Sequence, residues 1–334
     1  MADASVSVGV VGASGYAGAI AAQLIDRHPA FELAYVTARA EAGMRLGDLH
    51  PRTRVDRELT EFDPDAPADA AIVGYPHGAA APTVAALRER GVRVVDLSAD
   101  FRLTDRATYE QWYGEHGAPE LLGSAVYGLP ELYREQLADA GLVAGPGCYP
   151  TAALLALVPL ARAGLIGDAV IIDAKSGVSG AGRAATDTTH FVSANEDLRP
   201  YKVGGHRHRP EIEQELAAAG ADRRVVFVPH LAPLSNGELD SCYVQAARPT
   251  SQEELDDVFA QAYADEPFVT VLDRPPGVLE VRETNDCRLS VHLDAEAGQI
   301  LVFAAIDNLW KGTASQAVQS LNLMFGRPEC EGLR

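Results

Sequence analysis

The pattern of apolar and polar positions changes about halfway along the chain. In the first half, short runs rich in Val, Ile and Leu alternate with stretches whose apolar residues recur at helical spacing. This alternation is typical of a parallel sheet covered by helices. The predicted strands are residues 5–11, 32–37, 70–74, 92–97 and 142–144, and the predicted helices are 17–27, 82–90 and one opened by Pro150.

The second half mixes element types. Residues 241–246 and 269–272 alternate apolar and polar positions, as half-buried antiparallel strands do, and 289–293 and 300–306 flank a turn as the strands of a hairpin do. The other expected elements are strands 169–174 and 225–228, helices 211–219 and 313–325, and a loop of small residues at 177–185.

These patterns predict an α/β protein with two domains. Residues 1–147 are expected to form a Rossmann-type dinucleotide-binding domain, to which 312–334 return. Residues 148–311 are expected to form an α+β domain with a mixed or antiparallel sheet, which carries catalysis and oligomerisation.

Composition narrows the class of protein. The chain has 334 residues and a net charge of −19, which argues against a nucleic-acid or membrane-surface binder. No apolar run is long enough to span a membrane, and the start of the chain does not read as a signal peptide. The four cysteines are scattered without a paired motif, which favours a reducing, cytoplasmic location over a disulfide framework or a zinc site.

The segment 12-GASGYAG-18 follows the first predicted strand and leads into the first predicted helix. Glycines at this turn let backbone N–H groups at the helix start hold a pyrophosphate. At the end of the second strand, Thr37 and Arg39 stand where NAD-binding proteins usually place an acid for the ribose hydroxyl, which favours NADP, although Glu41 is nearby. The predicted cofactor ligands here are Gly12, Ser14, Gly15, Tyr16, Ala17, Gly18, Thr37, Ala38 and Arg39.

Short-chain dehydrogenases share this glycine spacing, but they need a Tyr four residues before a Lys. Lys175, Lys202 and Lys311 are the lysines of the chain, and none of them has that tyrosine. This class of dehydrogenase is therefore disfavoured.

Cys148 lies in 143-VAGPGCYPTAALLALVP-159, between a Gly-Pro-Gly turn and a long apolar run. Pro150 suits the first turn of a helix, so Cys148 is expected at or next to the N-cap. The positive end of the helix dipole should then lower the pKa of the thiol and favour the thiolate. A thiolate beside a dinucleotide fold indicates thioester chemistry. We also expect Pro159 to kink the helix.

The same segment resembles the active-site signature of the N-acetyl-γ-glutamyl-phosphate reductases. The resemblance runs along the chain through GASGYAG, PHG at 76–78, DLSADFR at 96–102, YGLPEL at 127–132, KSGVSGAGR at 175–183, GGHRHRPEI at 204–212 and DNLWKGTASQAV at 307–318. It implies a fold like that of glyceraldehyde-3-phosphate dehydrogenase and a homodimer or homotetramer. It also implies that the first histidine of HRH, His206, is the catalytic acid or base, and that His208 contacts substrate.

A histidine suits proton transfer near neutral pH, but the residues alone do not rank His206 against His208. A metal pair is disfavoured because no further ligands have suitable spacing. An acyl phosphate with a carboxylate needs arginines, for which Arg102, Arg183, Arg207 and Arg209 are candidates, and Tyr201 is a further polar candidate. By resemblance, the remaining cofactor contacts are Ser98, Ser179, Gly180 and Asn308.

The predicted activity is NADPH-dependent reduction of N-acetyl-γ-glutamyl phosphate to N-acetylglutamate 5-semialdehyde through a thioester on Cys148, with no metal. The alternative is a reductase of lysine or ornithine synthesis whose aminoadipyl or glutamyl phosphate is attached to a carrier protein. That enzyme tends to read GCNATA where this chain has GCYPTA. Aspartate-semialdehyde dehydrogenase shares the chemistry but lacks this histidine motif. A non-catalytic NADP-binding scaffold is also disfavoured, because it would need neither an accessible thiol at a helix start nor the HRH motif.

Overall fold

The computed structural model describes residues 5–334, and it divides the chain into two compact units. One unit comprises the residues up to Pro146 together with Thr313–Arg334, and the other comprises Gly147–Gly312. No helix among the described residues is long and apolar enough to cross a membrane.

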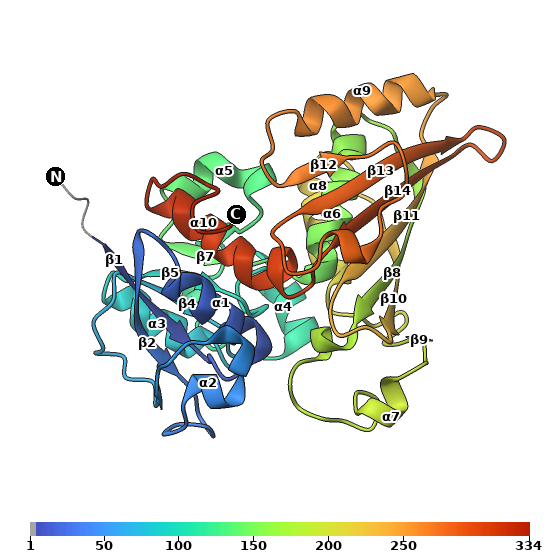
Figure 1. The fold of residues 1–334 in the computed structure, drawn as a ribbon. Helices are drawn as coiled ribbons and strands as arrows, with labels where there is room; N and C mark the ends of the chain where they lie inside the picture. The colour runs from blue at the N-terminus through green and yellow to red at the C-terminus, as the bar shows by residue number, and fades with distance from the viewer. Residues whose placement is uncertain (1–4) are drawn as a thin grey trace. The chain divides into compact units, whose positions relative to one another are not determined.

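The first unit is built on a seven-stranded parallel sheet with the order β3-β2-β1-β4-β5-β7-β6 (Figure 1). Its strands are β1 (Val6–Val11), β2 (Phe31–Thr37), β3 (Leu59–Thr60), β4 (Ala70–Val73), β5 (Arg93–Asp96), β6 (Val126–Tyr127) and β7 (Leu142–Ala144). Its helices are α1 (Tyr16–Asp26), α2 (Leu46–Leu49), α3 (Ala81–Glu89), α4 (Arg106–Tyr113), α5 (Pro130–Ala138) and α10 (Ser315–Met324). The central strands β4, β5 and β7 are almost wholly buried, as expected of a sheet with both faces covered.

The last helix belongs to this unit, because α10 packs on α1 and α5. It is buried nearly all round, polar residues included, where the sequence pattern suggested an amphipathic helix. A π-helical turn, Trp310–Ala314, precedes it.

The second unit has a seven-stranded mixed sheet with the order β12-β13-β14-β11-β8-β10-β9. Its strands are β8 (Ile166–Gly177), β9 (Arg199–Pro200), β10 (Val225–Ala232), β11 (Glu238–Ala246), β12 (Val269–Val271), β13 (Cys287–Asp294) and β14 (Gln299–Ile306). Its helices are α6 (Cys148–Arg162), α7 (Phe191–Ala194), α8 (Arg209–Ala218) and α9 (Gln252–Tyr263). β13 and β14 form the predicted hairpin, but β12 pairs with β13 in parallel, so its assignment as an antiparallel strand was wrong.

Helices α6, α8 and α9 cover one face of this sheet (Figure 1). On the other face, Ile171 and Val226 are neighbours in the β8–β10 register and are 41% and 57% exposed. The apolar core therefore lies between the sheet and α6, whose residues from Tyr149 to Ala161 are all buried.

Helix α6 runs through Pro159 to Arg162 as one helix. Proline has no N–H, so the carbonyl of Leu155, four residues earlier, receives no helical hydrogen bond from position 159. The hydroxyl of Tyr263, at the end of α9, donates to this carbonyl instead. A residue more than a hundred positions away thus completes the helix that begins at Cys148.

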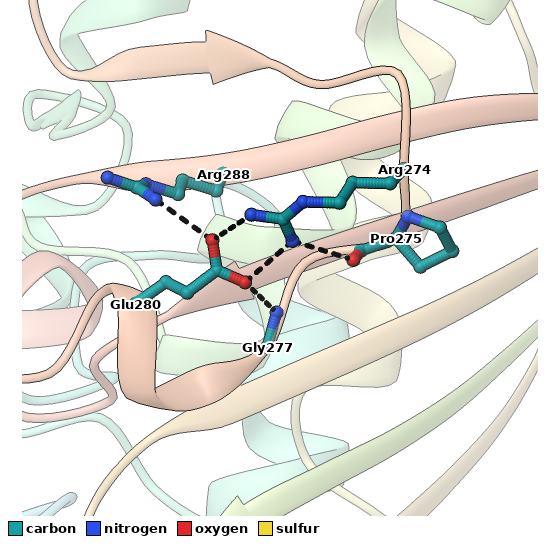
Figure 2. A network of polar contacts seen from close by, with 5 residues as sticks. All are labelled: Arg274, Pro275, Gly277, Glu280 and Arg288. Carbon is teal, nitrogen blue, oxygen red and sulfur yellow. Dashed lines mark hydrogen bonds and ion pairs between the residues drawn. The ribbon is translucent and has the colours of Figure 1, made fainter.

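A polar network holds the loop between β12 and β13 (Figure 2). Glu280 accepts from Arg274 through both carboxylate oxygens, at 2.9 and 2.8 Å, and from Arg288 at 2.9 Å and the Gly277 N–H at 2.8 Å. Arg274, as the leading cause, holds the pKa of Glu280 down to about 2. The network is exposed, so it organises the loop more than it stabilises the core.

Candidate functional site

The glycine loop of the first unit has the geometry of a phosphate cradle. Gly12 has φ of +80°, which few side chains tolerate. A Cβ on Gly18 would lie 2.4 Å from the Gly12 carbonyl oxygen, so only glycine lets α1 pack this closely on β1. Gly15 is the N-cap of α1, and a Cβ there would meet nothing nearer than 3.7 Å. The loop therefore leaves the N-terminus of α1 open to a ligand.

The end of β2 holds this loop in place. The Thr37 carbonyl accepts the N–H groups of Gly12 and Ala13 at 3.0 and 2.8 Å, and His50 Nε2 bonds the Ser14 carbonyl at 2.9 Å. Thr37 is 2% exposed, so its hydroxyl is not presented to a 2′-phosphate as the sequence suggested. Thr37 shapes the cradle instead, and His50 is a contributor that the motif did not reveal.

Arg39 is the exposed cation at the carboxyl end of β2. Its guanidinium lies over the ring of Tyr75, 4.3 Å from the ring centroid. Ala38, beside it, is 1% exposed and donates its N–H to the Thr60 carbonyl. Of Thr37, Ala38 and Arg39, only Arg39 has an exposed side chain.

The motifs PHG and DLSADFR lock together through Asp100. Its carboxylate accepts the N–H groups of Gly78, Ala80 and Ala81 at 2.6, 3.1 and 3.0 Å, which caps the start of α3. Ser98 is 1% exposed, and its hydroxyl donates to Asp96 at 2.6 Å and accepts the Asp100 N–H. The hydroxyl of Ser98 thus organises this turn, and its predicted contact with the cofactor stays a prediction.

The guanidinium of Arg102 forms hydrogen bonds with backbone carbonyls of the first unit. Arg102 is 5% exposed, and it donates through Nε to the Gly145 carbonyl at 2.7 Å and through Nη2 to the Leu97 carbonyl at 2.9 Å. Gly145 belongs to the turn directly before Cys148. The structure therefore gives Arg102 a part in shaping that turn, in addition to any contact with substrate.

Cys148 is the first residue of α6, after Gly147 as N-cap, so its predicted place at the helix start is confirmed. The Gly147 N–H donates to Glu211 Oε1 at 2.9 Å. A Cβ on Gly147 would lie 2.5 Å from His208 Nε2, and one on Gly312 would lie 2.8 Å from the Cys148 Cβ. Close packing on three sides thus fixes the cysteine, which keeps partial exposure to solvent.

The ionisation of this thiol differs from the sequence-based expectation. Burial, followed by the nearby carboxyl of Glu238, raises the pKa of the Cys148 thiol well above its usual value. The backbone N–H of Tyr149 acts in the expected, lowering direction, but burial and the acid outweigh it. Burial and an acid on β11, neither of which the sequence showed, therefore act against the expected lowering of this pKa.

The two histidines of HRH lie in one aromatic cluster with Tyr149 and Tyr201. His206 is 8% exposed, and its ring centroid is 4.7, 5.8 and 5.4 Å from those of His208, Tyr149 and Tyr201. The backbone N–H of His208 donates to His206 Nδ1 at 3.1 Å. Because an N–H can only donate, Nδ1 must accept, and the neutral ring carries its proton on Nε2. His206 is thereby prepared as a hydrogen-bond donor.

Tyr201 and Tyr149 form a short hydrogen-bonded chain. The Tyr201 hydroxyl donates to the Tyr149 hydroxyl at 3.3 Å, and that hydroxyl donates to the His230 carbonyl at 3.2 Å. Burial raises the pKa of both phenols, so they stay neutral. Tyr149 follows Cys148 directly, so these hydrogen bonds link Tyr201, a predicted substrate residue, to the residue next to Cys148.

The small-residue loop after β8 is tied down by Asn308. Its Oδ1 accepts the Gly237 N–H at 2.8 Å, and its Nδ2 donates to the Ser179 hydroxyl at 3.1 Å. Asn308 is 1% exposed, so its visible role is to hold Ser179 and Gly180 against β11. Arg183, further along the loop, is exposed. No role was predicted from the sequence for the remaining residues around the start of α6. They are Glu211, Glu238, Tyr149 and Gly312.

Two protein-family models match the chain, one within each of its two units. Residues 7–140 match the NAD-binding domain of the semialdehyde dehydrogenases, and residues 148–308 match their dimerisation domain. Together the two matches cover most of the chain.

Similar proteins that align with nearly the whole chain show the family to which it belongs. The N-acetyl-gamma-glutamyl-phosphate reductase of Moorella thermoacetica is 48% identical over 98% of both chains, and that of Dehalococcoides mccartyi is 48% identical over 97% of this chain and 96% of its own. The chain belongs to the N-acetyl-γ-glutamyl-phosphate reductase family. A reductase of the same name from Halorhodospira halophila is also 48% identical, over 98% of both chains. The family expected from the motifs is therefore confirmed.

Solved structures confirm the fold of this reductase-family chain. Aspartate semialdehyde dehydrogenase II from Vibrio cholerae, complexed with ASA, matches with a TM-score of 0.74 at 18% identity, over 96% of this chain and 98% of that one. The aspartate semialdehyde dehydrogenase from Candida albicans, solved with NADP, matches with a TM-score of 0.72 at 17% identity, over 96% of this chain and 98% of that one. At this identity the likeness concerns the fold, and it agrees with the predicted pairing of a Rossmann-type unit with a mixed-sheet unit.

Proposed function

We propose that the chain catalyses the NADPH-dependent reduction of N-acetyl-γ-glutamyl phosphate to N-acetyl-L-glutamate 5-semialdehyde, with release of phosphate, through a thioester on Cys148. The observation that carries this proposal is Cys148, a half-buried residue that begins α6 beside the histidine loop: a Cβ on its N-cap, Gly147, would lie 2.5 Å from His208 Nε2. Near-half identity to reductases of that name supports the choice of substrate. The domains follow from the same reasoning: residues 1–147 with 312–334 bind NADP, and 148–311 carry catalysis and association.

The glycine loop fits a dinucleotide. Gly12 and Gly18 let backbone and helix approach closely, and Gly15 leaves the positive end of α1 open to a pyrophosphate. The exposed guanidinium of Arg39 suits the 2′-phosphate that distinguishes NADP from NAD. Bound NADPH would supply the hydride that reduces the thioester.

Cys148 performs the covalent step. Its sulfur forms a bond to the γ-acyl carbon, and the bond from that carbon to the phosphate oxygen breaks, so phosphate leaves with the electron pair. The negative charge that develops on the acyl oxygen is stabilised by backbone N–H groups at the start of α6, because the dipole of a fifteen-residue helix adds to them. The apolar burial of α6 keeps this geometry rigid.

His206 acts on the oxygen of the thiohemiacetal. With Nδ1 accepting from the His208 backbone, the ring offers its Nε2 proton to the oxygen and stabilises the charge there. The role is that of a hydrogen-bond donor, because a base would need Nε2 unprotonated. Tyr201, His208, Arg102 and Arg183 are the proposed substrate contacts for the remaining polar groups.

We further propose that the chain assembles as a homodimer or homotetramer through the second unit. The match to a dimerisation domain supports association, and Ile171 and Val226 expose apolar surface on the uncovered face of its sheet. Light scattering after size-exclusion chromatography measures the state directly, and a monomer at micromolar concentration would contradict this proposal. A free reactive thiol is best kept reduced in the cytoplasm, which is the proposed location.

The reverse reaction tests the activity. The protein is mixed with N-acetylglutamate 5-semialdehyde, phosphate and NADP, and NADPH absorbance is followed. We expect a rise that requires phosphate, and its abolition in Cys148→Ser with NADPH binding retained. Substantial turnover by Cys148→Ser would refute covalent catalysis at this residue. No rise with a normally reactive Cys148 would overturn the free substrate and favour a carrier-linked one.

A further inference from the structure

Tyr75 is an aromatic residue beside the glycine loop, and the proposed function gives it no role. It follows β4 and is 8% exposed, within the apolar core that includes Val11 and Ala80. In the parallel sheet, β1 lies between β4 and β2, so residues that follow these three strands meet at the same edge. Tyr75, Gly12 and Arg39 are such residues.

The ring of Tyr75 contacts two parts of the predicted cofactor site. A Cβ on Gly12 would lie 3.1 Å from its Cδ1, so the ring packs closely against the first residue of the glycine loop. The guanidinium of Arg39 lies over the same ring, 4.3 Å from its centroid. One buried ring therefore connects the loop expected to hold the pyrophosphate with the cation expected to meet the 2′-phosphate.

An aromatic face holds a guanidinium without consuming its hydrogen-bond donors. The positive charge is attracted to the face of the ring, whereas the N–H groups lie around the edge of the planar guanidinium. Among residues 5–334, Arg39 has no hydrogen-bond or ion-pair partner, so these donors are available to a ligand. Contact with the ring also restricts an exposed side chain that would otherwise lose its rotamer freedom when it binds a phosphate.

We propose that Tyr75 is a positioning residue that selects NADPH over NADH, because its ring holds the Arg39 guanidinium in place for the 2′-phosphate. The proposal rests on the NADPH-dependent function given above and adds a determinant of its cofactor specificity. NADH has a hydroxyl where NADPH has this phosphate, so an ordered Arg39 favours the binding of NADPH alone.

The contact of the ring with Gly12 provides a way to separate this role from a structural one. Gly12 belongs to the loop expected to hold the pyrophosphate, and both cofactors contain that group. A ring that only supported the loop would therefore affect NADPH and NADH equally. A ring that positions Arg39 affects NADPH alone.

The test is fluorescence titration of the full-length chain and its Tyr75 variants with NADPH and with NADH. Tyr75→Leu keeps an apolar side chain in the core and removes the aromatic face. A cation–π contact of an exposed cation corresponds to about two- to fivefold in affinity, so the dissociation constant for NADPH should rise by about this factor while that for NADH stays unchanged. Tyr75→Phe keeps the face and should retain the wild-type selectivity. Tyr75→Met is a second variant without an aromatic face, should leucine prevent folding.

Because the ring acts through Arg39, the two residues should be coupled. In an Arg39→Ala background, Tyr75→Leu should change the dissociation constant for NADPH no more than that for NADH. Tyr35→Leu is the matched control, because it removes a tyrosine ring on β2 that packs against the same apolar core, and it should leave the ratio of the two constants unchanged.

Equal weakening of NADPH and NADH by Tyr75→Leu would leave the ring only its packing role and would overturn the proposal. Unchanged affinity for NADPH would also overturn it, and so would the same selective loss when Arg39 is already alanine.

Wild-type turnover in the phosphate-dependent assay separates this proposal from the function. Turnover without a selective loss in Tyr75→Leu overturns the role of Tyr75 alone. A selective loss without turnover overturns the proposed reaction and leaves the role of Tyr75 standing. Equal affinity of the wild type for the two cofactors overturns that role together with the preference for NADPH.

Discussion

The hydrogen bond from Tyr263 to the Leu155 carbonyl should contribute measurably to the stability of the helix that carries Cys148. Tyr263 is 7% exposed, and the carbonyl is left without a helical donor by Pro159. Tyr263→Phe keeps the ring and removes only the donor. Leaving a buried carbonyl unsatisfied costs about 1–3 kcal/mol, so this is the expected loss in free energy of unfolding.

Repeating Tyr263→Phe in a Pro159→Ala background tests whether the missing N–H of Pro159 is the cause of this loss. Alanine restores an N–H at position 159, which can donate to the Leu155 carbonyl four residues earlier. Tyr263→Phe should then cost less than about 1 kcal/mol, because the carbonyl already has a donor. The two changes should therefore be coupled by about 1 kcal/mol or more in a double-mutant cycle.

Urea unfolding followed by tryptophan fluorescence can isolate the second unit. The chain has two tryptophans, Trp112 in the first unit and Trp310 in the second, so a Trp112→Phe background reports on the second unit alone. With a slope of about 2 kcal/mol per molar urea, the expected loss lowers the midpoint by about 0.5–1.5 M. An equal loss in the proline and alanine backgrounds would refute the argument, and so would no loss in either.

Three further predictions concern the site and the loops. Gly312→Ala places a Cβ 2.8 Å from the Cys148 Cβ, so turnover should fall at least tenfold while NADPH binding, measured by fluorescence, is retained. Arg39→Ala should weaken NADPH binding by about tenfold and leave NADH binding nearly unchanged, and a variant with unaltered NADPH affinity would contradict the 2′-phosphate assignment. The pKa of Glu280 is lower in the folded protein than in the unfolded chain, so its contribution to stability is present above about pH 4.5 and is lost as the pH falls toward 2. The melting temperature of Glu280→Gln should therefore fall less steeply than that of the wild type between pH 5 and pH 2, and parallel curves would count against the loop network.

Much of the fold could be predicted because it depends on local patterns. Apolar runs located the central strands, and the Gly-Pro-Gly turn before Pro150 located the start of α6 within two residues. The α9 helix was missed although a signal was present, since Ser251 accepts the Glu254 N–H as an N-cap should. The direction of β12 could not be predicted, because alternation of apolar and polar residues does not say whether the neighbouring strand is parallel.

The sequence by itself determined which chemistry is present: a thiol at a helix start, two histidines after a glycine pair, and a glycine loop for a dinucleotide. The tertiary structure decided how these groups are tuned. Glu211 accepts a hydrogen bond from Gly147 across more than sixty positions of sequence, the carboxyl of Glu238 helps to raise the pKa of Cys148, and the Thr37 carbonyl supports the glycine loop. Motifs report residue types and local spacing. The pKa of a group and the partner of a hydrogen bond depend on burial and on strand register, which only the packed chain establishes.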